Sequence, residues 1–132
     1  MNAAFQAVFD AFKQAGNPGV FRVVSSAVGF NIVPRDGAPF DVPISIPVGR
    51  RSLAQLLPDM LATVGAASGN RDLLARAPVN WLMQTSAEGG ASGDRFGEVL
   101  TRVLSSGRNR LSWRLLYDFG MEAYYLNLHN VH

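Results

Sequence analysis

The stretch that decides the fold runs from Ala15 to Pro34 and reads AGNPGVFRVVSSAVGFNIVP. It admits two interpretations. In the first, Asn17 caps a helix that Gly29 ends, because apolar residues fall at helical spacing, namely Val20, Val23, Val24, Ala27 and Val28. In the second, Asn-Pro-Gly is a turn, and the runs FRVV and FNIVP pair as a β-hairpin.

An internal comparison favours the hairpin. Residues 5–34 place a helix, a glycine, a short polar turn and two β-branched runs in that order, and residues 96–128 repeat the order with WRLL and YYLNL. The second copy cannot easily be helical across Asp118 to Gly120. Valine and isoleucine also fit a pleated sheet better than a helix. We therefore predict a hairpin over residues 20–34.

The composition is that of a folded domain. The chain has 132 residues, enough for one sizeable core, and 48% of them are hydrophobic and 17% charged. No run of about 18 apolar residues predicts a membrane span, and we see no signal-peptide pattern. The absence of cysteine excludes disulfides and thiolate metal sites. The net charge is +2 and the arginines are dispersed among acids, so we expect no nucleic-acid partner.

Apolar residues at helical spacing predict three amphipathic helices. The first helix covers residues 5–15 and is expected to end at Gly16. The second covers residues 53–64, with Ser52 as its expected N-cap and Gly65 as its stop. The third covers residues 96–106, with Ser92 or Asp94 as its N-cap and Gly107 as its stop. Pro58 lies inside the second pattern, so we expect a kink there or a later start of that helix.

Aromatic and branched residues predict the strands. Leu111 to Tyr117 and Glu122 to Leu128 are joined by a four-residue link, which favours a closing hairpin. Shorter β-like runs cover residues 42–46 and 82–87, and Pro43 makes the first of these an edge strand.

These elements predict an α+β fold of βαββ-type units, with about three amphipathic helices packed on a mainly antiparallel sheet. We expect a single globular domain over residues 1–132. Within it, two degenerate units, an αββ unit at 3–34 and a βαββ unit at 82–129, are joined by a middle strand and helix. The expected core consists of Phe5, Phe9, Phe12, Leu57, Leu61, Phe96, Leu100, Val103, Trp113, Leu115 and Tyr124.

The unit from Thr85 to Leu128 resembles the short N-terminal domain shared by bacterial secretins and TonB-dependent transducers. The likeness rests on a strand, a Gly-Ala-Ser turn, an apolar helix stripe, Gly107 and a closing hairpin that contains WRLL. Residues 3–34 resemble the same motif without its leading strand. The family domain is about half as long, and residues 35–80 have no counterpart in it.

The resemblance implies a non-catalytic interaction module that docks a protein partner in the periplasm or cell envelope. One candidate docking site is the segment from Ile44 to Ile46, which has a proline at either end, as suits an edge strand. Ile44 and Ile46 point to one side and Ser45 to the other, so an added strand would find main-chain groups and an apolar shelf. The alternative is that loop 35–42 covers this edge.

A second candidate surface lies on the closing hairpin. Alternation places Trp113 and Tyr124 toward the core. The opposite face would then carry a polar and aromatic patch suited to partner recognition, made of Arg114, Tyr125 and Asn127. The alternative is an ordinary solvated sheet face with cross-strand pairs.

The sequence contains no catalytic or metal-binding constellation. His129 and His132 have no third ligand nearby, and no two carboxylates form a DxD or ExxE pair. The glycines before Asp94 lack the lysine of a phosphate-binding loop. We therefore predict no cofactor, no metal and no catalysis. The alternative is a small hydrolase or ligand-binding enzyme, with a site built from loops 35–42 and 65–80.

Overall fold

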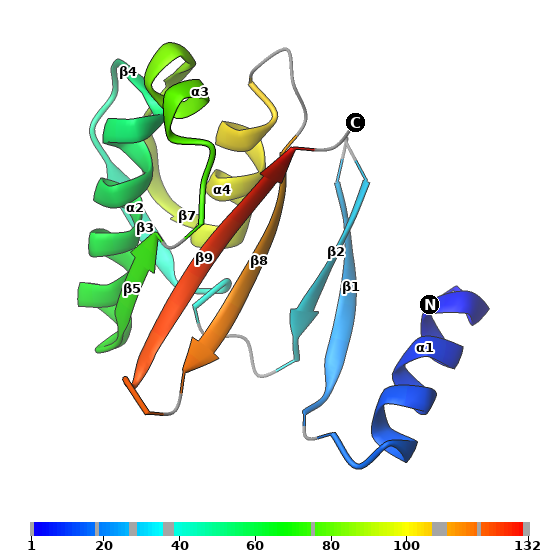
Figure 1. Cartoon of the computed structure of the whole chain (residues 1–132). Coiled ribbons are helices and arrows are strands. Elements are labelled where there is room, and N and C mark those ends of the chain that lie inside the picture. The colour runs from blue at the N-terminus through cyan, green and yellow to red at the C-terminus, as the bar shows by residue number, and fades with distance from the viewer. Residues whose placement is uncertain are drawn as a thin grey trace. The chain divides into compact units, whose positions relative to one another are not determined.

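The structure is a computed structural model, and it describes residues 2–17, 19–26, 29–35, 39–74, 76–106, 111–118 and 120–130. The chain divides into two compact units, residues 1–38 and residues 39–132 (Figure 1). The described residues form helices and strands, and the strands pair mainly antiparallel, so the predicted α+β class is confirmed. No described helix is long and apolar enough to cross a membrane.

Within its described residues, the first unit holds one helix and one hairpin. Helix α1 (Ala3–Gln14) begins at Asn2, whose side chain accepts a hydrogen bond from the Ala4 amide at 2.9 Å. Strands β1 (Phe21–Ser26) and β2 (Gly29–Pro34) follow and pair antiparallel. The hairpin interpretation of the opening stretch is therefore confirmed.

Phenylalanine rings join α1 to this hairpin. Phe5 contacts Phe30 with ring centroids 5.3 Å apart, and Phe12 contacts Phe21 at 5.4 Å. The prediction that Phe5, Phe9 and Phe12 are core residues is nevertheless wrong, since α1 has no buried residue. A two-stranded hairpin offers too little surface to enclose the apolar face of a helix.

The second unit holds three helices and seven strands within its described residues. The helices are α2 (Leu53–Ser68), α3 (Val79–Gln84) and α4 (Phe96–Leu104). The strands are β3 (Pro43–Ile46), β4 (Arg50–Ser52), β5 (Arg71–Leu74), β6 (Ser86–Glu88), β7 (Ala91–Arg95), β8 (Leu111–Asp118) and β9 (Ala123–Asn130). Two antiparallel ladders, β3-β7 and β4-β6, accompany a three-stranded sheet β5-β9-β8, in which β5 runs parallel to β9.

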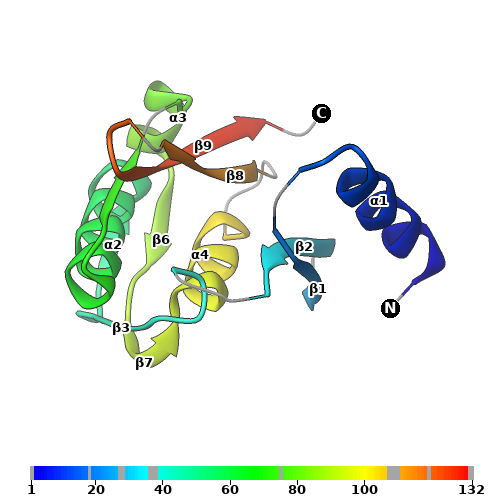
Figure 2. The ribbon, with the colours of Figure 1, turned by 90° about the horizontal axis from the view of Figure 1, so that it is seen from below.

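The core of this unit lies where α2 and α4 cover one face of the three-stranded sheet (Figure 2). The predicted core residues of the two helices are all buried, namely Leu57, Leu61, Phe96, Leu100 and Val103. Trp113, Leu115 and Tyr124 are only half-buried, which corrects their prediction as core. Trp113 and Leu115 lie on β8, the edge of the sheet, where one flank has no neighbouring described strand.

Helix α2 differs from its prediction at its end. Its N-cap is Ser52 as predicted, and it begins at Leu53 although Pro58 lies inside it. Pro58 is exposed, so its ring lies on the solvent side of the helix. The helix passes through Gly65, which is buried, and ends at Gly69 in the left-handed conformation with φ +74°.

Helix α4 is capped by backbone and not by Ser92 or Asp94, both of which lie in β7. The amides of Phe96 and Gly97 donate to the carbonyls of Val42 and Phe40, each at 2.9 Å. These bonds satisfy donors that a cap side chain would otherwise bind, which explains why no side-chain cap is needed. Gly107, the predicted stop of this helix, lies outside the described residues.

Two further features depart from the predictions. The run 82–87 is not one strand, because α3 ends at Gln84 and β6 begins at Ser86. Strand β5 lies in the segment 65–80, which is predicted as a loop. The single domain, with its two degenerate units joined by a middle strand and helix, stays a prediction.

Candidate functional site

The β8-β9 hairpin brings three of the predicted binding residues onto one face. Arg114 lies directly opposite Asn127, and Tyr125 lies opposite Leu116 in the antiparallel register. Residues opposite one another in a ladder point to the same side of the sheet. We call Arg114, Leu116, Tyr125 and Asn127 the outer face, because Trp113, Leu115 and Leu126 alternate with them and point toward the core.

The outer face is accessible to a partner. Arg114 is exposed, 52% of Leu116 is exposed, and Tyr125 and Asn127 are half-buried. It combines a cation, an apolar side chain, a phenol and an amide within two neighbouring strands. Such a mixture of aromatic, apolar and arginine side chains is typical of recognition surfaces.

Asn127 also has a structural role that the sequence did not indicate. Its side-chain oxygen accepts a hydrogen bond from the Arg76 amide at 3.0 Å. The Arg76 carbonyl in turn accepts from the Leu128 amide at 2.7 Å. These two bonds attach the segment that follows β5 to β9, so Asn127 is committed in part to holding the sheet together.

Strand β8 is an edge strand of the described three-stranded sheet. Of the described strands only β9 pairs with it, so the main-chain groups of β8 that point away from β9 have no strand partner in the described part of the chain. The strand is 8 residues long and contains no proline. An open edge of this length is a template for an added strand.

Strand β3 offers less exposed apolar surface to an added strand than predicted. Ile44 and Ile46 are buried, so the apolar shelf expected for an added strand is already occupied by the protein's own core, and that part of the prediction is wrong. Ser45 is exposed, and its hydroxyl accepts a hydrogen bond from the Gly93 amide at 3.3 Å. Strand β3 pairs with β7, with an irregularity between Ile44 and Ser45. Docking through its remaining main-chain groups stays a prediction.

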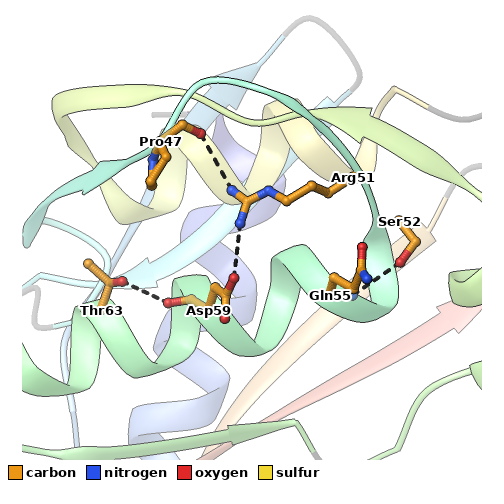
Figure 3. A network of polar contacts seen from close by, with 6 residues as sticks. All are labelled: Pro47, Arg51, Ser52, Gln55, Asp59 and Thr63. Atoms are coloured by element: carbon orange, nitrogen blue, oxygen red, sulfur yellow. Dashed lines mark hydrogen bonds and ion pairs between the residues drawn. The ribbon is translucent and has the colours of Figure 1, made fainter.

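A polar network at the start of α2 has a structural explanation (Figure 3). The Arg51 guanidinium donates to the Asp59 carboxylate at 2.9 Å and to the Pro47 carbonyl at 3.5 Å. The Thr63 hydroxyl donates to the Asp59 carbonyl at 2.7 Å. Arg51 thereby joins the loop before β4 to α2, so these contacts hold local structure.

The remaining acids that the structure describes, together with His129, form no group that could hold a metal ion. Asp41 lies 3.6 Å from Arg95, and the Asp118 carboxylate accepts hydrogen bonds from the Gly120 and Met121 amides in the β8-β9 turn. Among the described residues, no group of three or more potential ligands could hold a metal ion. His132 lies outside the described residues.

Asp72 in β5 is the exception among the acids, because it is buried. Only 7% of its surface is exposed, and neither carboxylate oxygen has a hydrogen-bond partner. Burial raises the pKa of Asp72 from 3.8 to about 6. A raised pKa is also a property of catalytic acids, but this carboxyl is packed inside the unit, out of reach of a substrate. The sequence does not predict its burial, because the run RDLL falls in the segment 65–80 that is predicted as a loop.

The close packing around Asp72 leads to a prediction for Gly65. An added Cβ there would lie 2.8 Å from the Asn70 carbonyl oxygen and 3.0 Å from a carboxylate oxygen of Asp72. We expect Gly65→Ala to lower the free energy of unfolding by about 1–3 kcal/mol, because overpacking outweighs the gain in helix propensity. Urea denaturation at pH 7 measures the change.

The matched control for this variant is Gly97→Ala in α4. The added Cβ would meet Phe40 at 3.4 Å or more, which is an ordinary contact. We expect the free energy of unfolding to change by less than about 1 kcal/mol. Equal stabilities of the two variants would contradict the packing assigned to Gly65.

No protein-family model, curated protein or solved structure matches this chain.

Proposed function

We propose that residues 39–132 form a non-catalytic docking module that binds an extended segment of a protein partner as an added strand along β8. The observation that carries the proposal is the open, 8-residue edge of β8 beside the exposed outer face. Main-chain hydrogen bonds along the edge would supply affinity, and alternate side chains of the added strand would supply specificity.

Two observations favour β8 over β3 as the docking edge. Strand β3 has 4 residues and an irregular register, whereas β8 has 8 residues that pair with β9 without a register shift. An irregularity bends a strand and disturbs the regular spacing that an added strand needs. The apolar side chains of β3 are also already buried.

The side chains of the outer face indicate the chemistry of the partner. A residue of the added strand opposite Leu116 would gain contact if it is apolar, and a residue opposite Arg114 would gain contact if it is acidic. The fitting partner is therefore an extended segment with an acidic residue two positions from an apolar one, since alternate residues point to the same side.

The resemblance of residues 85–128 to the short N-terminal domain of secretins and TonB-dependent transducers supports placing this docking in the periplasm or cell envelope. The same resemblance supports a protein partner over a small molecule. The alternative enzyme with a site built from loops 35–42 and 65–80 stays a prediction. The described acid within those loops that has a raised pKa, Asp72, is buried.

Site-specific photo-crosslinking tests the proposal. A photoreactive residue is placed at Leu116, or at Met83 on α3 as an exposed control, in the full chain directed to the periplasm of a bacterial host. We expect a defined protein adduct from position 116 and none from position 83. The peptide joined to position 116 is then identified by mass spectrometry, and a synthetic copy is titrated against the purified chain.

Reversing the charge of Arg114 tests whether this residue contributes to binding of the peptide or only lies near it. Arg114→Glu is expected to weaken binding of the synthetic peptide at least tenfold, because a cation that faces an acid becomes a like charge. Arg50→Glu, an exposed arginine on β4, is the matched control and should leave binding within about twofold. Equal binding by both variants, or adducts of equal yield from both positions, would overturn the docking site.

A further inference from the structure

The buried carboxyl of Asp72 has no role in the docking surface, and its position needs an explanation. It lies on β5, the short edge strand of the three-stranded sheet, and points to the face that α2 covers. Neither oxygen has a hydrogen-bond partner. An ionised carboxylate without a partner is among the most unfavourable groups to bury in a protein.

The backbone around Asp72 also disfavours a negative charge. An oxygen of its carboxylate lies beside Gly65 in the last turns of α2, together with the Asn70 carbonyl. The Asn70 amide donates to the Gly65 carbonyl at 3.1 Å, so the chain turns tightly at this point. The C-terminal end of a helix carries partial negative charge, which repels an anion and favours a neutral carboxylic acid.

No described charged group faces Asp72 to compensate its ionised form. On β9 the residue opposite it is Tyr124, and Tyr125 and His129 point to the other face of the sheet. On α2 the ionisable residue is Asp59, which is exposed and paired with Arg51. Arg71 on β5 itself is exposed and alternates to the other face. Burial therefore dominates the titration of Asp72.

The strand that carries this carboxyl covers one edge of β9. Strand β5 has 4 residues, pairs in parallel with Ala123 to Leu126, and packs on α2. Whatever weakens the contact of β5 with α2 exposes main-chain groups of β9, the central strand of the sheet. Short edge strands are the elements most readily opened by local unfolding.

We propose that Asp72 is a protonation-controlled latch, whose neutral form holds β5 between α2 and β9 and whose ionised form loosens β5 and uncovers the edge of β9. Because burial raises the pKa of this carboxyl from 3.8 to about 6, the weakening accumulates as the pH rises from roughly 4 to roughly 7. The latch is independent of docking at β8, which lies on the other side of β9.

Amide hydrogen exchange of the full chain tests the latch. Protection factors, which correct for the intrinsic pH dependence of exchange, are measured at pH 5 and pH 8 for the wild type and for Asp72→Asn. In β9 the Leu128 amide points to the β5 side, and alternation places the Tyr124 and Leu126 amides on that side too. In the wild type we expect protection of the Tyr124 and Leu126 amides to fall about tenfold between pH 5 and pH 8, while protection in α4 is unchanged. In Asp72→Asn the fall should be absent. Asp59→Asn is the matched control and should behave as the wild type.

Equal protection at both pH values in the wild type, or a tenfold fall that persists in Asp72→Asn, would overturn the latch. Titration of the Asp72 carboxyl carbon by NMR keeps the test decisive if Asp72→Asn does not fold. In the wild type, protection should keep falling up to the midpoint of that titration and should level off within about one pH unit above it. Protection that is already constant more than one pH unit below the NMR midpoint would overturn the proposal.

Discussion

Leu100→Ala is expected to lower the free energy of unfolding by about 2–5 kcal/mol. Leu100 is fully buried in α4, on the same stripe as Phe96 and Val103. Removing its isobutyl group leaves a cavity that the surrounding helices and sheet can fill only in part. Urea denaturation followed by circular dichroism at constant pH measures the loss.

The control for this truncation is Leu116→Ala, which removes the same atoms from a side chain that is 52% exposed. We expect a change of about 0.5 kcal/mol or less, as for most surface positions. A loss below about 1 kcal/mol in Leu100→Ala would remove α4 from the core of the second unit, whatever the control shows.

The stability difference between the wild type and Asp72→Asn is expected to depend strongly on pH. The pKa of Asp72 is raised in the folded protein from 3.8 to about 6, so the folded state binds the proton more tightly than the unfolded chain. This contribution to stability is fully present below about pH 3.8 and is lost as the pH rises through about 6. Each pKa unit corresponds to about 1.4 kcal/mol, which gives a total change of about 3 kcal/mol.

Asparagine at position 72 has nearly the same shape but does not titrate. Relative to the wild type, Asp72→Asn should therefore gain about 2–3 kcal/mol of stability between pH 4 and pH 8. Urea denaturation of both proteins at several pH values gives the difference, from which the contributions of all other titrating groups cancel. A difference that is constant across this range would show that Asp72 ionises as readily in the folded protein as in the unfolded chain.

The parts of the fold that the sequence predicted are those that local patterns determine. The hairpin of the first unit follows from β-branched runs on either side of a turn, and β8 and β9 follow from the same signal. The stripes of α2 and α4 gave their buried residues correctly, because periodicity reports which face of a helix is apolar.

These local patterns do not predict which strands pair when they are far apart in the sequence. Strand β5 has only 4 residues and follows α2 after Gly69 and Asn70, and its parallel partner β9 is about fifty positions away in the sequence. A short run such as RDLL carries no period that separates a strand from a loop. For the same reason the burial of Asp72 could not be foreseen, since nothing local marks an aspartate that faces a helix.

The candidate site was predicted only in part, because local patterns show which side chains share a face but not which of them the rest of the chain buries. Alternation alone placed Arg114, Tyr125 and Asn127 on one face, and the register of β8 with β9 agrees. The β3 segment was misjudged because the prolines indicate an edge but do not show which side chains the rest of the chain buries. The hydrogen bond between the Asn127 side chain and the Arg76 amide joins residues 51 positions apart, so local patterns do not predict it.

The attachment of Arg76 to β9 determines what becomes of β5 once it is released. The segment is anchored on one side by the end of α2 at Gly69 and on the other by the bonds of Arg76 to Asn127 and Leu128. A strand tethered at both ends keeps a high effective concentration beside its old position and closes again quickly. A second strand that binds the uncovered edge of β9 must therefore compete with β5 of the same chain. Only a peptide present at high local concentration, such as one tethered within the same assembly, would displace β5.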